Sequence, residues 1–477
     1  MRMMLDDVAR AAGARLLRPA GQAVAITGAS SDSRTVSPGD LFVCVPGERT
    51  DGHDHAADAV KAGAAAVLAQ RDPFSGEAGS RLPLTPVLLA DNSVAALGRL
   101  GHAWRAAFRG KVAGVTGTAG KTTLKELLAH VLAGHGKTAR NPLNLNTQIG
   151  LPLSMLRTGG DETFWVMEAG ISHAGDMDEL GPIMEPDLAV ILNVGAGHTE
   201  GLGGRGVAQC KARLLKYLAP GAQALVSADY PDLVRETRAV CPTAVYFSTT
   251  GKQMPYRASY LGPATDPDGN GRGRYRLWLD GDSLDVTCAL TGPYGAENVV
   301  AAAAAAHLLG LSTEEIAAGI GSAALPAQRF ARLIVPGWTL IDDSYNANPL
   351  SCARMIEAAA ELARDKALVC VMGEMLELGD EADRQHVELG RALACARAVF
   401  WVGGHADRVR EGLDKEHFSG LFRALARPED FLPAFAEWQG ARPDRDGEGL
   451  ILFKGSRGNR LVRLVNAFAE SRVPHAL

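Results

Sequence analysis

Short apolar runs alternate with helical patterns along most of this 477-residue chain. The runs at 162–170 and 186–195 end in glycine or acidic residues, and a helical pattern at 207–218 leads into the next run. Glycine contributes 54 residues, an excess over the usual ~7% that favours tight turns between strands and helices. This alternation predicts an α/β fold in which helices cover a mostly parallel sheet.

A glycine-rich segment lies between one apolar run, 111–116, and an amphipathic helical pattern. Backbone amides of such a turn can face a phosphate, the lysine supplies a positive charge, and the hydroxyl that follows can bind magnesium. The strict pattern GxxxxGK[ST] requires glycine at position 115, where Val115 stands instead. A solvated glycine turn is the alternative, but the flanking strand and helix favour binding of a nucleoside triphosphate such as ATP. The predicted nucleotide contacts are Gly117, Thr118, Ala119, Gly120, Lys121, Thr122 and Thr123.

Two polar residues follow other predicted strands at the same edge of the sheet. Glu168 lies near the end of the run 162–170, and His198 follows the run 186–195. In open α/β sheets ligands bind at the carboxyl ends of the strands, where the glycine-rich loop also lies. Together with Thr122 they are candidate ligands of Mg²⁺, although each alone is more often an ordinary edge residue.

The length predicts three domains at about 150 residues each. Residues 1–93 form a small α/β domain, 94–325 a central P-loop-type domain with helices on both faces of its sheet, and 326–477 a Rossmann-like α/β domain. Alternating patterns predict a hairpin at 275–290, on the edge of the central sheet, and a second hairpin at 332–344. We place the joint near Leu325, with a hinge extending to Arg329.

Composition excludes several classes of protein. The net charge of −5 argues against nucleic-acid binding over the whole surface. The longest apolar stretch, 299–306, is far shorter than the ~18 residues of a membrane span, and the start lacks the apolar segment of a secretory signal. The seven cysteines form no CxxC pair, so no disulfide framework or zinc ribbon is expected. We expect a cytoplasmic, monomeric protein without a membrane or nucleic-acid partner.

The motifs together resemble the Mur ligases. The resemblance rests on TGTAGKTT, NLNTQIGLPLS at 144–154, MEAG, NVGAGH, QCKARLL and IDDSYNANP at 341–349. The last of these, with GEMLELGDEADRQH and LFKGSR, resembles the members that add D-alanyl-D-alanine to UDP-N-acetylmuramoyl-tripeptide. Members that add the third amino acid usually carry a DNPR-type motif, and no DNP string occurs here.

The resemblance implies roles for residues in the first two domains. The segment 30–53 is similar to the UDP-binding domain of the family, with Ser33, Arg34, Arg49 and Thr50 as nucleotide-sugar contacts. Lys121 becomes a ligand of the β- and γ-phosphates, and Asn144 and Asn146 line the muramoyl-peptide channel.

The resemblance also implies that Lys211 is carbamylated. A lysine cation, with a pKa of about 10.4 in water, cannot help to hold magnesium, whereas its carbamate is an anion with two oxygens. The family often has glutamate two residues later, where Arg213 stands, and Ser172 replaces a frequent asparagine. Arg213 either pairs with a carbamate or marks a rearranged site.

The remaining implied residues lie near the joint and in the last domain. Asn298 touches adenine or ribose, and Arg329 reaches the γ-phosphate when the last domain closes. Asp343 and Asn346 face the nucleotide, while Lys454 and Arg457 hold the dipeptide carboxylate.

The expected activity is ATP-dependent amide ligation through an acyl phosphate, with Lys121, His198, Lys211 and Arg329 as the catalytic residues. A ligase for a single amino acid and a folate polyglutamate ligase are alternatives within the fold. A P-loop ATPase that acts as a switch is the alternative from another class, and it predicts phosphate release that needs no acceptor amine.

Overall fold

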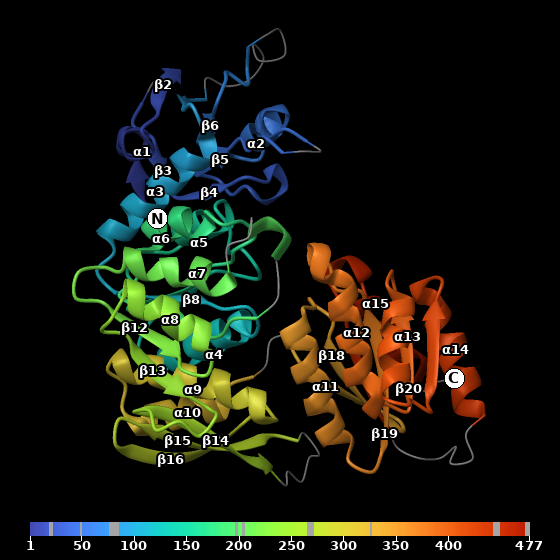
Figure 1. Cartoon of the computed structure of the whole chain (residues 1–477). Coiled ribbons are helices and arrows are strands. Elements are labelled where there is room, and N and C mark those ends of the chain that lie inside the picture. The colour runs from blue at the N-terminus through green and yellow to red at the C-terminus, as the bar shows by residue number, and fades with distance from the viewer. Residues whose placement is uncertain are drawn as a thin grey trace.

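The computed structural model describes residues 1–18, 22–47, 50–75, 85–195, 199–202, 206–264, 271–324, 327–441 and 449–472. The chain forms the predicted α/β fold in three units. The N-terminal unit stacks on one end of the central unit, and the C-terminal unit lies beside the central unit (Figure 1).

The N-terminal unit is built on a five-stranded sheet in the order β2-β7-β6-β5-β4. Only β2, among these strands, runs antiparallel to its neighbour. Helix α3 packs against α1 of this unit and against α5 and α6 of the central unit, which joins the two. The elements are β1 (Met3–Met4), α1 (Leu5–Ala12), β2 (Arg15–Arg18), β3 (Ala25–Ile26), β4 (Gly28–Ser30), β5 (Asp40–Val43), α2 (Ala56–Lys61), β6 (Ala66–Ala69), β7 (Val87–Leu89) and α3 (Ser93–Ala107).

The central unit is a nine-stranded sheet in the order β16-β15-β14-β13-β12-β11-β8-β10-β9. Strands β8 to β14 are parallel, and β15 and β16 form the predicted hairpin at the edge. The strands are β8 (Lys111–Thr116), β9 (Thr138–Arg140), β10 (Phe164–Glu168), β11 (Leu188–Ile191), β12 (Gln223–Ser227), β13 (Val245–Ser248), β14 (Tyr256–Pro263), β15 (Gly273–Leu279) and β16 (Asp282–Cys288). The helices are α4 (Lys121–Ala133), α5 (Gly150–Leu156), α6 (Asp176–Met184), α7 (Val207–Ala212), α8 (Pro231–Val240), α9 (Pro293–Leu308) and α10 (Thr313–Ser322).

Helices cover both faces of the central sheet, as predicted. Successive side chains of a strand point to opposite faces, so Ala113 and Val115 pack into the core under α4, α9 and α10. Val112 of the same strand packs into the opposite core, under α5, α6 and α7. Burial on both faces explains why these strands are continuously apolar in the sequence.

The C-terminal unit is a six-stranded sheet in the order β17-β18-β22-β19-β20-β21. The predicted hairpin forms β17 and β18, and the other strands are parallel. The predicted joint at Leu325 lies outside the described residues. The elements are β17 (Ala331–Val335), β18 (Trp338–Asp343), α11 (Pro349–Ala363), β19 (Ala367–Gly373), α12 (Ala382–Ala392), β20 (Ala398–Val402), α13 (Ala406–Lys415), β21 (Leu421–Leu425), α14 (Phe431–Gly440), β22 (Gly449–Lys454) and α15 (Val462–Arg472).

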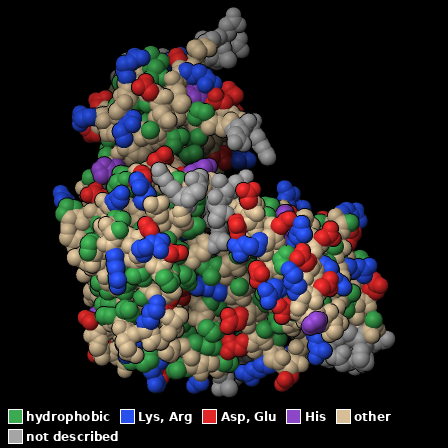
Figure 2. Space-filling view, viewed as in Figure 1, with side chains coloured by type: hydrophobic (Ala, Val, Ile, Leu, Met, Phe, Trp, Pro, Cys, Tyr) green, Lys and Arg blue, Asp and Glu red, His purple; other side chains and the backbone are tan. Residues whose placement is uncertain are grey.

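Charges of both signs are mixed on the visible surface of the C-terminal unit (Figure 2). Among the described residues, no helix is long and apolar enough to cross a membrane.

Candidate active site

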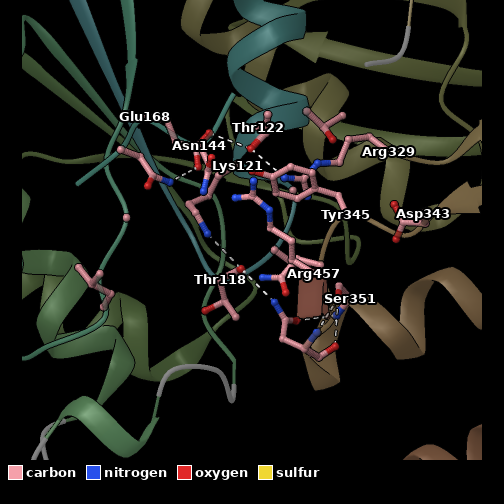
Figure 3. A pocket seen from close by; sticks show the side chains of 18 of the residues that line it. Thr118, Lys121, Thr122, Asn144, Glu168, Arg329, Asp343, Tyr345, Ser351 and Arg457 are labelled. Atoms are coloured by element: carbon pink, nitrogen blue, oxygen red, sulfur yellow. Dashed lines mark hydrogen bonds between the residues drawn. The ribbon is translucent and has the colours of Figure 1, made fainter. Parts of the chain in front are cut away.

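A cavity of about 530 Å³ lies between the central and C-terminal units. The central unit contributes the loop between β8 and α4, the segment 144–148 and the end of β10. Figure 3 shows Arg329, Tyr345 and Arg457 facing Lys121, Thr122 and Glu168 across this cavity. The site is therefore formed by both units.

Of the predicted phosphate-binding residues, 118–123 line the cavity, from the loop after β8 and the first turn of α4, whereas Gly117 is not among the lining residues. Helix α4 begins at Lys121, so the positive end of its dipole lies at the cavity. Gly120 has a φ of 76°, and a Cβ there would lie 2.9 Å from Nδ2 of Asn298. The backbone conformation and the close approach both require glycine at this position.

The side chain of Lys121 is hydrogen-bonded to the loop that precedes it. Its Nζ donates a hydrogen bond to the carbonyl of Thr118 at 3.3 Å. Burial lowers the pKa of Lys121, while the carboxylate of Glu168 acts in the opposite direction. The ammonium therefore lies where a phosphate would compensate its charge.

Glu168 and Thr122 form the polar centre of the site. Glu168 ends β10, which pairs with β8 so that Glu168 is opposite Val115. The Thr122 hydroxyl donates to Oε2 of Glu168 at 2.8 Å, and Nδ2 of Asn146 donates to Oε1 at 2.7 Å. Among the described residues no group of three or more His, Cys, Asp or Glu could hold a metal. Two protein oxygens nevertheless suit Mg²⁺, which takes its other ligands from phosphates and water.

Lys211 is buried in α7, with 3% of its surface exposed. Burial lowers the pKa of Lys211 well below its usual value, and the nearby Lys121 adds to the shift. Arg213 is engaged elsewhere, because its guanidinium pairs with Asp178 at 2.6 Å. This contact offers no support for a pair between Arg213 and a modified Lys211.

Arg329 reaches the phosphate loop from the joint between the units. Its Nη2 donates to Oγ1 of Thr122 at 3.2 Å. Its guanidinium lies 4.0 Å from the ring centre of Tyr345, a cation–π contact that fixes its orientation. The N-cap of α11, Asn348, also reaches across, with Nδ2 3.3 Å from the carbonyl of Thr118.

Lys454 and Asp343 are paired with each other. Nζ of Lys454 lies 2.5 Å from Oδ2 of Asp343 and 3.0 Å from the carbonyl of Asn346. The other oxygen of Asp343 accepts the amide of Phe330 at 3.1 Å. Lys454 is thus a buried lysine that fixes the first turn after β18, whereas the exposed Arg457 remains available to a ligand.

Asn298 lines the cavity and carries an unpaired acceptor. It is buried, and its Oδ1 has no hydrogen-bond partner in the structure. Buried polar atoms are nearly always hydrogen-bonded, so the atom is suited to a donor group of a ligand. Apolar side chains that sequence reasoning missed line the same cavity: Leu290, Tyr294, Phe330 and Met355.

Three of the predicted nucleotide-sugar residues, Ser33, Arg34 and Thr50, lie apart from this cavity, on the N-terminal unit. The Arg34 guanidinium holds the pKa of Asp32 at about 2 through a side-chain hydrogen bond. The Thr50 hydroxyl is 2.8 Å from Nε2 of His55, and Ser33 begins the short turn that contains Arg34. Arg49 and His198 lie outside the described residues.

Sequence reasoning missed three residues that support the site: Asn193, Glu297 and Arg354. Nδ2 of Asn193 donates to Oε2 of Glu297 at 2.7 Å, and Oδ1 accepts the amide of Ala119 at 2.9 Å. Asn193 follows a strand at the same sheet edge as Glu168, and Glu297 precedes Asn298, so both positions were open to prediction. Arg354 comes from α11 of the other unit, and its contact depends on how the units dock.

Comparison with known proteins agrees with this architecture. Family models match at 25–91 (Mur ligase family, catalytic domain), 115–306 (Mur ligase middle domain) and 328–457 (Mur ligase, glutamate ligase domain). The UDP-N-acetylmuramoyl-tripeptide--D-alanyl-D-alanine ligase of Escherichia coli is 30% identical, over 94% of this chain and 95% of its own. The Bacillus subtilis ligase of the same name is 29% identical over 98% of each chain.

Solved structures give the same result. MurF from Acinetobacter baumannii superposes with a TM-score of 0.86 at 28% identity, over 98% of this chain and 99% of that one. MurF ligase from Thermotoga maritima, in complex with ADP, gives a TM-score of 0.79 at 27% identity, over 94% and 98%. The three matched domains and the relative at 30% identity over nearly the whole chain place this protein in the Mur ligase family.

Proposed function

We propose that this chain is an ATP-dependent ligase that joins D-alanyl-D-alanine to UDP-N-acetylmuramoyl-tripeptide, forming the pentapeptide precursor of peptidoglycan. The observation that carries the proposal is the cavity in which the phosphate loop of one unit faces Arg329 and Arg457 of another. Relatives matched over nearly their whole length carry this activity in their names. Its nucleotide and nucleotide-linked substrates suit a cytoplasmic enzyme.

ATP occupies the cavity with its phosphates on residues 117–123. Lys121 and Arg329 neutralise charge on the phosphoryl oxygens, and their partly buried setting strengthens this effect. Asn298 offers its unpaired Oδ1 to a donor of the adenosine, and Phe330 and Met355 form apolar walls for the base. Asn346 faces the nucleotide, while Asp343 acts indirectly by holding Lys454.

Thr122 and Glu168 would hold Mg²⁺, with His198 as the third predicted neighbour. When bound, the ion neutralises and orients the phosphate oxygens. A carbamate on Lys211 would add an anion at the same end of the sheet. Burial favours this modification because it lowers the pKa of the lysine and so raises the share of the neutral amine, the form that adds to CO₂.

The reaction proceeds in two displacements. The terminal carboxylate of the tripeptide attacks the γ-phosphorus of ATP, which forms an acyl phosphate and releases ADP. The amine of D-alanyl-D-alanine then attacks the acyl carbon, phosphate leaves, and a proton is lost from nitrogen. Docking of the two units keeps water from the acyl phosphate.

Each unit holds one ligand, which explains why the protein has three units. We assign 1–93 to the UDP-sugar, through Ser33, Arg34, Arg49 and Thr50, and 94–325 to ATP. Asn144 and Asn146 line the peptide channel between them. Residues 326–477 bind the dipeptide, in a side cavity of about 140 Å³ lined by Asn346, Leu376, Ser456 and Arg457. Arg457 is the partner for the dipeptide carboxylate, and Lys454 supports the loop behind it.

Phosphate release measures the proposed function directly. The assay contains ATP and magnesium, and it omits in turn D-alanyl-D-alanine and each of two tripeptides, one ending in diaminopimelate and one in lysine. We expect release only with the dipeptide and one tripeptide, which also identifies the third residue. Release without the dipeptide would indicate an ATPase switch, and release with a single amino acid or a folate would indicate another ligase of this fold.

A further inference from the structure

A chain of hydrogen bonds connects the C-terminal unit to the phosphate loop. Nη1 of Arg354, on α11, donates to Oε2 of Glu297, on α9, at 2.7 Å. The same oxygen accepts Nδ2 of Asn193 at 2.7 Å. Oδ1 of Asn193 accepts the amides of Thr118 at 3.0 Å and of Ala119 at 2.9 Å. This series of hydrogen bonds therefore runs from a helix of one unit to the phosphate loop of the other.

The burial of Glu297 makes its ion pair with Arg354 important to this series of hydrogen bonds. The side chain of Glu297 is 3% exposed and that of Arg354 is 18% exposed. A buried carboxylate is costly unless a positive charge compensates it. Tyr230 supplies a second hydrogen bond, to Oε1 at 2.8 Å, but burial raises the pKa of its phenol, so it remains a neutral donor. Separation of the units would leave Glu297 without Arg354.

Asn193 is held at both ends of its amide. Besides Glu297, Nδ2 donates to the carbonyl of Ala119 at 3.0 Å. The side chain is fully buried. A shift of the Glu297 carboxylate therefore moves the amide that holds two N–H groups of the loop. The loop in turn presents Lys121 and Thr122 to the cavity.

We propose that Arg354 is a positioning residue that couples docking of the C-terminal unit to the shape of the phosphate loop, acting through Glu297 and Asn193. Docking completes the series of hydrogen bonds and holds the phosphate loop in the conformation that binds ATP. By reciprocity, bound ATP favours docking. The inference rests on the proposed function, in which ATP binds the central unit and the dipeptide binds the C-terminal unit.

A double-mutant cycle tests the coupling in the full-length protein. The variants are R354Q, E297Q and the double variant, and calorimetry measures the Kd of ADP and of a non-hydrolysable ATP analogue. Each single substitution raises the nucleotide Kd about tenfold. The double variant has a Kd no higher than that of the single variant that binds less tightly, because the effects of substitutions within one hydrogen-bond network do not add. In the ligation assay the KM for ATP rises by a similar factor, while kcat changes less. R354K, which keeps the charge, restores part of the affinity.

R105Q is the matched control. Arg105 forms a buried ion pair with Asp187 at 2.8 Å in the central unit, away from the cavity. R105Q lowers the Tm but leaves nucleotide affinity unchanged. If R354Q does not fold, R354K with E297Q gives the same cycle.

Two results would overturn the inference. If R354Q weakens binding as much in the E297Q background as in the wild type, Arg354 touches the nucleotide directly. If neither substitution changes nucleotide affinity, the conformation of the phosphate loop does not depend on these hydrogen bonds. Failure of the proposed function is recognised separately, because the wild type would then bind ATP without ligating the dipeptide, and the binding cycle would still decide the coupling.

Discussion

Lys211 and Lys121 are two lysines at the same end of the central sheet, near one carboxylate, Glu168. Burial and the charge of Lys121 lower the pKa of Lys211. The neutral form of a buried amine reacts with CO₂ to give a carbamate anion and a proton, so the group at this position changes from neutral to negative. Activity should therefore depend on dissolved CO₂.

Removal of CO₂ should lower ligase activity, and bicarbonate should restore it. K211M, which cannot form a carbamate, should stay about a hundredfold below the wild type, the usual cost of losing one electrostatic group in an active site. It should not respond to bicarbonate. The measurement is phosphate release in CO₂-free buffer before and after addition of bicarbonate. Equal rates for the wild type under both conditions would exclude a functional carbamate.

His386 is a buried histidine of α12, and we expect it to contribute to the pH dependence of stability. Its Nδ1 is 2.7 Å from the carbonyl of Ala382, and Nε2 accepts the amide of Met375 at 3.2 Å. The first contact places a proton on Nδ1 and the second needs an unprotonated Nε2, so together they require the neutral ring, and burial lowers the pKa of His386. The unfolded chain, with a histidine pKa of about 6.5, therefore takes up a proton that the folded chain resists.

The contribution of His386 to the free energy of unfolding should thus be highest above about pH 6.5 and fall as the pH drops from there towards the lowered pKa of the folded state. H386Q should cost about 1–2 kcal/mol at neutral pH, for the lost acceptor and packing, and should remove part of the pH dependence. Urea unfolding at several pH values measures both. An unchanged slope in H386Q would assign the pH dependence to other groups.

At the scale of elements, the turn from β8 to α4 shows why the sequence predicted this part of the site. The strand, the glycine turn and the helix are local in sequence, and parallel pairing of β8 with β10 brings Glu168 to the same edge. The departure from the strict phosphate-loop pattern at Val115 is explained by its burial in the core under α4, within β8. Side-chain burial, rather than a loop conformation, sets that position.

Gly120→Ala should damage the site through this turn. A left-handed φ costs a residue with a Cβ about 1–2 kcal/mol, and the Cβ would press on Asn298 at 2.9 Å. ADP binding should weaken about tenfold or more, since 1.4 kcal/mol corresponds to a factor of ten. Gly134→Ala is the matched control at the other end of α4, where φ is −69° and the nearest neighbour lies at 3.5 Å. Calorimetry should show an unchanged affinity for ADP in Gly134→Ala. An equal loss of ADP affinity in both variants would contradict a special role of Gly120.

At the scale of the whole molecule, two long-range side-chain pairings escaped prediction, one within the C-terminal unit and one between units. The resemblance implies that Lys454 holds the dipeptide carboxylate, but its ammonium pairs with Asp343, and this pairing depends on β22 lying beside β18. The contact of Arg354 with Glu297 depends on docking of two units that fold on separate cores. Neither long-range pairing nor docking leaves a local pattern in the sequence, whereas loop, strand and helix chemistry does.

The docked arrangement of the central and C-terminal units can be locked to test whether catalysis requires them to separate. A Cβ at Gly195 would lie 3.3 Å from Cβ of Leu350, which is on α11. That separation is close to the roughly 3.5–4.5 Å of a disulfide, so the double variant G195C/L350C should form a bond after a small shift. Because the cavity lies between the units, substrates and product should exchange only when they part.

The oxidised double variant should therefore bind ADP but retain less than about a tenth of the ligase activity, and dithiothreitol should restore it. Each single cysteine variant controls for the substitutions and for the seven native cysteines, and thiol titration measures how much bond has formed. Full activity in the oxidised form would mean that the cavity exchanges its ligands while the units stay docked. Loss of ADP binding in that form would instead mean that the nucleotide enters only after separation, so that opening precedes ATP binding as well as product release.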